Sequence, residues 1–192
     1  MSKKILAAII VFLLVSISLL VVYFELQSVP LDKVSLTIED LGVDYKEFDK
    51  EHITEPYIAS DDTLFAGRKI LEKYRVSFSK INENGETNDS CFITIEIAKL
   101  EKNYEEAIST IKDTNFIYDY TELDNETIGE ESYIGKSITT ITINSEPKNV
   151  TLYFIVFRIG NIIVAMVSSE HTLEASINYA EIMENKILRY YD

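Results

Sequence analysis

The longest apolar run in the chain extends from Ile5 to Phe24 and contains no charged residue. A helix of this length rises about 30 Å, which matches the hydrocarbon core of a bilayer. The alternative is a cleaved secretory signal peptide, whose apolar stretch is normally about 7 to 15 residues and ends in small side chains. Here the run ends with Tyr23 and Phe24, which suit a membrane interface. The pattern therefore favours a retained transmembrane helix.

The charges beside this run predict its orientation. Lys3 and Lys4 precede it, whereas Glu25 follows it, and positive residues stay on the cytoplasmic side. We expect a single-pass protein of the cell membrane, with its N-terminus in the cytoplasm and its C-terminal domain outside. The four expected parts are a cytoplasmic N-terminus at 1–4, a transmembrane helix in the lipid bilayer at 5–24, a tether at 25–34 and an extracytoplasmic domain at 35–192.

Apolar and polar residues then alternate, as in β-strands. RVSFSKI (75–81) and CFITIEIAKL (91–100) predict two strands that form a hairpin through NENGETND, and YIGKSITTITI (133–143) predicts another strand. TLYFIVFR (151–158) and IIVAMVSS (162–169) meet around Gly160, at which a positive φ is tolerated. Both runs of this second hairpin are apolar on both faces, so we expect it at the centre of the sheet.

Two segments have the spacing of amphipathic helices. Asn103 can cap a first helix, with Glu106 closing a capping box, and this helix should end near Asp113. Thr172 can cap a terminal helix. The apolar stripe of the terminal helix comprises Leu173, Ile177, Ala180, Met183 and Ile187. The polar stretch 39–62 predicts loops with one helical turn.

These elements predict an α+β fold: an N-terminal transmembrane helix followed by an antiparallel sheet covered by helices, with the sheet as the middle layer. The chain has 192 residues, of which 32 are acidic and 18 basic. Without Lys3 and Lys4, the part after the apolar run has a formal charge of 16 − 32 = −16. Such a charge repels phosphate backbones, so we expect no nucleic-acid binding. Cys91 is the single cysteine, which excludes an intrachain disulfide.

A loop rich in carboxylates is the candidate cation site. It offers the hard oxygen ligands that Ca²⁺ prefers, at Glu122, Asp124, Glu126, Glu130 and Glu131. An EF-hand loop that started at Asp124 would have Gly135 in place of the final Glu, so the strict motif is absent. A solvated acidic loop is the alternative reading.

The other candidate sites are sequons and histidines. Asn88, Asn125 and Asn149 each begin an N-glycosylation sequon, a number close to that expected by chance. His52 and His171 are the only imidazoles, and nothing in the sequence pairs either with a nucleophile. We therefore expect no enzymatic activity and no cofactor.

IGEESYIGK (128–136) and VFRIGNIIVAMV (156–167), followed by a terminal amphipathic helix, resemble a known group of proteins. The group is that of membrane-anchored extracytoplasmic prokaryotic proteins of uncharacterised function with a PsbP/Mog1-like domain. The resemblance implies a central antiparallel sheet between helices and a membrane tether, and it transfers no catalytic residue.

Two functions follow from these expectations. The first is a binding or accessory module that uses the exposed sheet face or the acidic loop to engage an envelope protein or a small ligand. The second is a structural component of the cell envelope without a ligand, and a hydrolase is the least favoured alternative. A concave apolar pocket beside the sheet would favour binding, whereas a flat polar surface would favour the structural role.

Overall fold

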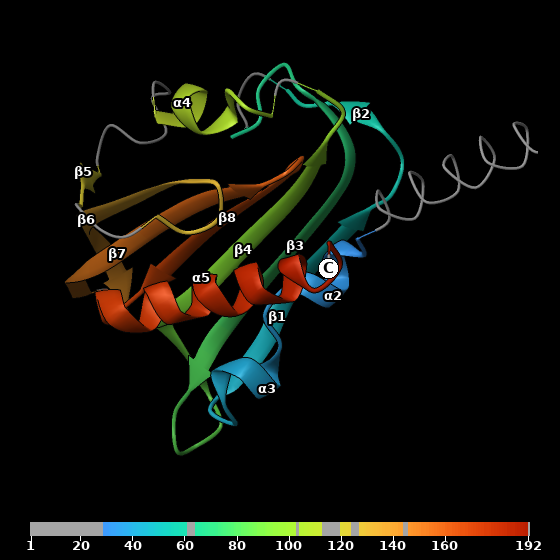
Figure 1. The fold of residues 1–192 in the computed structure, drawn as a ribbon. Helices are drawn as coiled ribbons and strands as arrows, with labels where there is room; N and C mark the ends of the chain where they lie inside the picture. The colour runs from blue at the N-terminus through green and yellow to red at the C-terminus, as the bar shows by residue number, and fades with distance from the viewer. Residues whose placement is uncertain are drawn as a thin grey trace, which may run out of the picture.

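The computed structural model describes residues 29–60, 64–102, 104–112, 120–123, 127–143 and 146–191. This part of the chain forms one antiparallel sheet of eight strands with four helices (Figure 1). The strands are β1 (Tyr45–Ile53), β2 (Tyr57–Ile58), β3 (Lys69–Ile81), β4 (Thr87–Leu100), β5 (Thr121–Glu122), β6 (Glu131–Ile143), β7 (Glu146–Ile159) and β8 (Ile162–Ser169). The helices are α2 (Leu31–Val34), α3 (Ile38–Leu41), α4 (Ala107–Lys112) and α5 (Leu173–Leu188).

The strand order is β1-β3-β4-β8-β7-β6-β5, and β2 pairs with β3 beside this path. The two predicted hairpins are confirmed as β3–β4 and β7–β8. The tight turn of the second hairpin lies between the paired residues Ile159 and Ile162, and Gly160 has a φ of 55° there. Strand β8 lies in the middle of the order, so the apolar hairpin is central as predicted.

Each face of the sheet has its own apolar core, because successive side chains of a strand point to opposite faces. On one face, Met183 of α5 packs with Ile95 of β4 and Phe157 of β7. On the other face, Ile108 of α4 packs with Val156 of β7. Figure 1 shows α5 lying across the strands near the middle of the sheet. The central strands are therefore buried on both sides, which explains their continuous apolar sequence.

The terminal helix α5 begins where the sequence predicted. Thr172 has extended backbone angles, and its hydroxyl accepts a hydrogen bond from the backbone N–H of Ala175 at 3.1 Å. Near the other end of the helix, Lys186 donates to the carboxylate of Asp40 at 2.6 Å and to the carbonyl of Ser35 at 2.9 Å. These bonds join α5 to the segment containing α2 and α3.

The predicted fold class is corrected by the structure. In the described part of the chain, no helix is both long enough and apolar enough to cross a membrane. The predicted transmembrane helix 5–24 lies outside the described residues. The predicted helical cover is also too large, since α2, α3 and α4 have only four, four and six residues. The described molecule is mostly antiparallel sheet.

The membrane localisation is corrected on the same finding. A single-pass protein with a cytoplasmic N-terminus was inferred from the length and hydropathy of one run and from the lysines before it. In the described structure, the long apolar segments are the central strands β7 and β8, whose side chains meet protein cores on both faces. Hydropathy measures a preference for apolar surroundings, and for β7 and β8 the two protein cores supply them.

The stretch 39–62 was wrongly predicted as loops with one helical turn. The helical turn is present as α3, but residues Tyr45–Ile53 form the edge strand β1. Seven of its nine residues are exposed. A strand with one neighbour and a solvated surface lacks the apolar alternation that identifies strands. The predicted cap Asn103 and the predicted helix end Asp113 lie outside the described residues, and α4 occupies Ala107–Lys112 between them.

Candidate functional site

The candidate site lies at the edge of the sheet where β5 stops pairing with β6. Among the described residues, strand β5 pairs with Lys136 and Gly135, whereas β6 continues to Ile143. On its inner side β6 pairs with β7 along its whole length. On its outer side, the described residues provide no strand that pairs with positions 137–143. We call these positions the free edge of β6.

The hydrogen-bond pattern shows which backbone groups the free edge presents. The N–H of Leu123 donates to the carbonyl of Ile134 at 2.8 Å, so Ile134 points its backbone groups outward. In an antiparallel strand, alternate residues point their N–H and C=O groups to the same side. Because the register of β6 with β7 has no irregularity, Ile138, Thr140 and Thr142 direct their N–H and C=O groups outward. These groups can pair with another extended chain.

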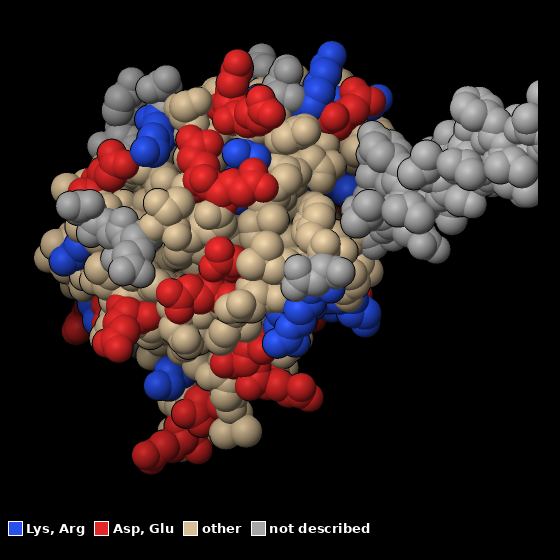
Figure 2. Space-filling model, in the orientation of Figure 1, with Lys and Arg blue, Asp and Glu red and all other residues tan. Residues whose placement is uncertain are grey.

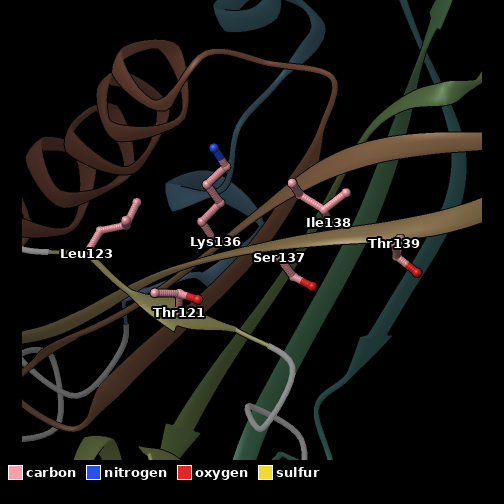
Figure 3. A pocket seen from close by; sticks show the side chains of 6 residues that line it. All are labelled: Thr121, Leu123, Lys136, Ser137, Ile138 and Thr139. Carbon is pink, nitrogen blue, oxygen red and sulfur yellow. The ribbon is translucent and has the colours of Figure 1, made fainter.

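A cavity of about 490 Å³ lies where the free edge begins. It is lined by Thr121, Leu123, Lys136, Ser137, Ile138 and Thr139. Figure 3 shows Leu123, Lys136 and Ile138 pointing to one side of the sheet, and Ser137 and Thr139 pointing to the other. Ile138 is 66% exposed although it is a large apolar residue. The cavity thus combines apolar side chains, hydroxyls and one amine, and Lys136 is the ionisable residue among the described residues that line it.

The opposite edge of the sheet is built differently. Strand β1 has the sequence YKEFDKEHI, in which charged residues occupy most positions. Its register shifts between Glu47 and Asp49, which marks a bulge at the exposed residue Phe48. Charges and bulges are the usual devices that stop an edge strand from pairing with another chain. By contrast, residues 137–145 contain no charge, so β6 lacks these devices along the positions that no described strand pairs on the outer side.

The candidate cation ligands are found in ion pairs. The carboxylate of Glu122 lies 2.9 Å from Nζ of Lys112. Glu130 contacts the guanidinium of Arg158, and an oxygen of Glu131 lies 3.9 Å from Nε of the same arginine. Asp124 and Glu126 lie outside the described residues, and within the described ones no cluster of three or more acidic, histidine or cysteine side chains could hold a metal ion. The calcium site stays a prediction.

Two of the three predicted glycosylation sites, Asn88 and Asn149, lie in the described part of the chain. Asn88 is exposed, and its side-chain oxygen accepts hydrogen bonds from the backbone N–H and the hydroxyl of Ser90. Asn149 is exposed on β7, and its side-chain oxygen accepts from the hydroxyl of Thr140 at 2.7 Å. Asn125 lies outside the described residues. Glycosylation at these three positions stays a prediction.

Both histidines make structural contacts. Nε2 of His52 lies 2.8 Å from the carboxylate of Glu72 at the β1 edge. Nδ1 of His171 lies 2.7 Å from the carbonyl of Ser169, so this nitrogen carries the proton. Nε2 of the neutral ring then accepts from the hydroxyl of Tyr45 at 2.6 Å. Burial raises the pKa of the nearby Cys91 thiol, which keeps it protonated and a poor nucleophile.

His171 makes stability dependent on pH. Burial lowers the pKa of His171 below 6.5, and the nearby Lys80 lowers it further, while the bond to Ser169 opposes this shift. The unfolded chain therefore takes up a proton at a pH where the folded chain does not. The free energy of unfolding keeps its full value with respect to His171 above about pH 6.5. It decreases as the pH falls through the lower pKa of His171 in the folded protein.

We expect the melting temperature of the protein to fall between pH 7.5 and pH 5.5 by more than that of His171→Gln. The comparison between the two proteins cancels the general change in net charge over this interval. Equal falls in both proteins, measured by thermal denaturation in matched buffers, would contradict the assignment of a neutral, buried His171.

The free edge of β6 was not found by sequence reasoning. The available signal was the run SITTITINS, in which β-branched residues alternate without any charge that would protect an exposed edge. Its position at an edge depends on the strand order, which local patterns do not contain. Comparisons with protein-family models, with curated proteins and with solved structures find no match to this chain.

Proposed function

We propose that this protein is a binding module without catalytic activity, which holds an extended segment of a partner protein along the free edge of β6. The observation that carries the proposal is the outward direction of the backbone groups of Ile138, Thr140 and Thr142 beside an open cavity. Strand addition to a sheet edge obtains affinity from backbone hydrogen bonds and specificity from pockets for alternate side chains.

The cavity indicates which partner segments fit. The exposed Ile138 and the neighbouring Leu123 offer apolar surface to one side chain of an incoming strand. The hydroxyls of Ser137 and Thr139 point to the other side of the sheet (Figure 3), where we expect a small polar side chain of the partner. The partner segment should therefore be extended, β-branched and alternately apolar and polar.

The charge of the protein adds a second preference. The chain carries a formal charge of −14, and acidic side chains are spread over the face drawn in Figure 2. A field of this sign accelerates the approach of positively charged partners. We expect basic residues to flank the uncharged stretch of the partner, because lysine or arginine within the paired segment would meet no carboxylate among the cavity residues.

A library of nine-residue peptides displayed on phage tests the proposal. Selection on the full protein should enrich peptides with alternating β-branched residues. Ile138→Lys should weaken their binding at least about tenfold, because a charge on an edge strand opposes pairing. The matched control is Phe48→Lys on β1, since Phe48 is also apolar and exposed, and this variant should bind like the unmodified protein.

Amide exchange measured by NMR locates the peptide. The bound peptide should protect the amides of Ile138, Thr140 and Thr142, whose N–H groups point outward. Failure to enrich any peptide, or equal binding by Ile138→Lys and the unmodified protein, would remove the proposed function.

A further inference from the structure

Another cavity, of about 450 Å³, lies between the α2–α3 segment and the strands β1 and β3. Its volume is within the range of small-molecule sites in proteins. Its lining includes Leu36, Tyr74 and Phe78, which are buried and belong to the core beneath α5. We call these three residues the floor of the cavity. A ligand in this cavity would therefore rest its apolar part on the edge of the core.

Hydrogen bonds hold the wall of the cavity that the α2–α3 segment forms. The backbone N–H and the hydroxyl of Thr37 donate to the carboxylate of Asp40 at 2.7 Å and 2.8 Å. The same carboxylate accepts from Lys186 of α5, which also donates to the carbonyl of Ser35. This wall is fixed to α5 in the absence of a ligand, so binding loses little affinity to ordering it.

A β-bulge directs two charged side chains of β1 toward the cavity. Residues three apart in a regular strand point to opposite faces of the sheet. The bulge at Phe48 inserts one extra residue, so Glu47 and Lys50 come to lie on the same face. Glu47 is opposite Phe78 of β3, and Lys50 is opposite Val76, which shares the core of Phe78. Both charged residues line the cavity.

The lining carries both signs of charge in weak pairs. Lys33 and Asp32 of α2 lie 3.7 Å apart, and Lys50 and Glu47 of β1 lie 3.8 Å apart. The four side chains are 34% to 68% exposed. Long, exposed ion pairs contribute little, so these groups can turn to a charged ligand. Glu39 of α3 also lines the cavity and forms no ion pair with a described residue.

The charges select the class of ligand. A simple anion would meet three carboxylates and a simple cation would meet two amines, whereas a zwitterion finds an opposite charge for each of its groups. We propose that this cavity binds a free α-amino acid with an aromatic or branched apolar side chain. The side chain lies on the floor, the carboxylate meets Lys50 and the ammonium group meets Glu39. This site goes beyond the proposed function, because the free edge of β6 lies toward the other end of the strand order.

Isothermal titration calorimetry of the full protein with L-phenylalanine tests the proposal. The dissociation constant should be about 1 mM or lower, as expected for a ligand of this size. Three related molecules each lack one feature: glycine lacks the apolar side chain, 3-phenylpropanoate lacks the ammonium group and phenethylamine lacks the carboxylate. Each of them should bind at least about fivefold more weakly than phenylalanine.

Lys50→Gln tests the position of the carboxylate. This variant should bind phenylalanine at least about fivefold more weakly, but it should not weaken the binding of phenethylamine, which has no carboxylate. Lys46→Gln is the matched control. Lys46 is an exposed lysine of the same strand, but it is opposite Ser79 and points to the other face of the sheet. It should bind phenylalanine like the unmodified protein.

Two results would overturn the inference: no saturable binding of phenylalanine at about 10 mM, or equal affinities of Lys50→Gln and Lys46→Gln for phenylalanine. Ile138→Lys separates this site from the proposed function, because it should lose peptide binding and keep the affinity for phenylalanine. A protein that binds phenylalanine but enriches no peptide keeps the inference and loses the proposed function.

Discussion

Replacing Gly129 with alanine is expected to lower the free energy of unfolding by at least about 3 kcal/mol, because two costs add at this position. Gly129 has a φ of 65°, which side chains of L-residues rarely adopt. An added Cβ would also collide with the backbone oxygen of Arg158. That oxygen accepts the N–H of Glu130 at 2.8 Å, so it cannot move without breaking this bond. The N–H of Gly129 further donates to Glu184 of α5 at 2.7 Å.

Gly85→Ala is the control for Gly129→Ala. Gly85 has a φ of 79°, but an added Cβ there would have no neighbour within 4 Å. Only the backbone strain remains, at about 1 to 2 kcal/mol. For a domain of this size, 3 kcal/mol corresponds to a fall of about 6 to 12 °C in melting temperature. Thermal denaturation that gave the same fall for both variants would refute the packing argument at Gly129.

Replacing Phe157 with alanine is expected to cost about 3 to 5 kcal/mol of stability. Phe157 on β7 is fully buried in the core that includes Ile95 and Met183. Removing its ring leaves a cavity between the sheet and α5 that the surrounding side chains refill only in part. Urea denaturation should show a lower midpoint with a similar slope.

Phe48→Ala is the matched control for Phe157→Ala. The same side chain is 57% exposed on the edge strand β1, so its truncation should change stability by about 0.5 kcal/mol or less. A loss below about 1 kcal/mol for Phe157→Ala would show that α5 does not pack on this part of the sheet.

Helices and turns were predicted correctly where a single pattern of neighbouring residues specified them. Thr172 and the apolar spacing after it indicated α5, and its cap bond is present. Gly160 indicated the turn between β7 and β8, and the pairing of these two strands ends at this turn. Both signals lie within a few residues of the element that they describe. Strand β1 was missed because its exposed residues carry no apolar alternation.

The membrane prediction also came from a local pattern, and it is corrected by the structure. It rested on the run Ile5–Phe24, whose residues lie outside the described structure, and no described helix could cross a membrane. The resemblance to membrane-anchored proteins with a PsbP/Mog1-like domain stays a prediction.

Glu122, Glu130 and Glu131 were grouped as metal ligands by proximity in sequence, but folding brings them against Lys112 and Arg158. Sequence proximity did not predict these cationic partners.

The sequence alone determined the two hairpins, the central position of the apolar strands and the start of α5, because periodicity and turn residues act over short distances. Only the tertiary structure decided that β4 lies beside β8, that β5 pairs with β6 at Lys136 and Gly135, and that positions 137–143 of β6 have no partner strand on their outer side among the described residues. These features depend on which strands become neighbours. Neighbours are chosen by the packing of both apolar cores at once, and no single stretch of the chain contains that information.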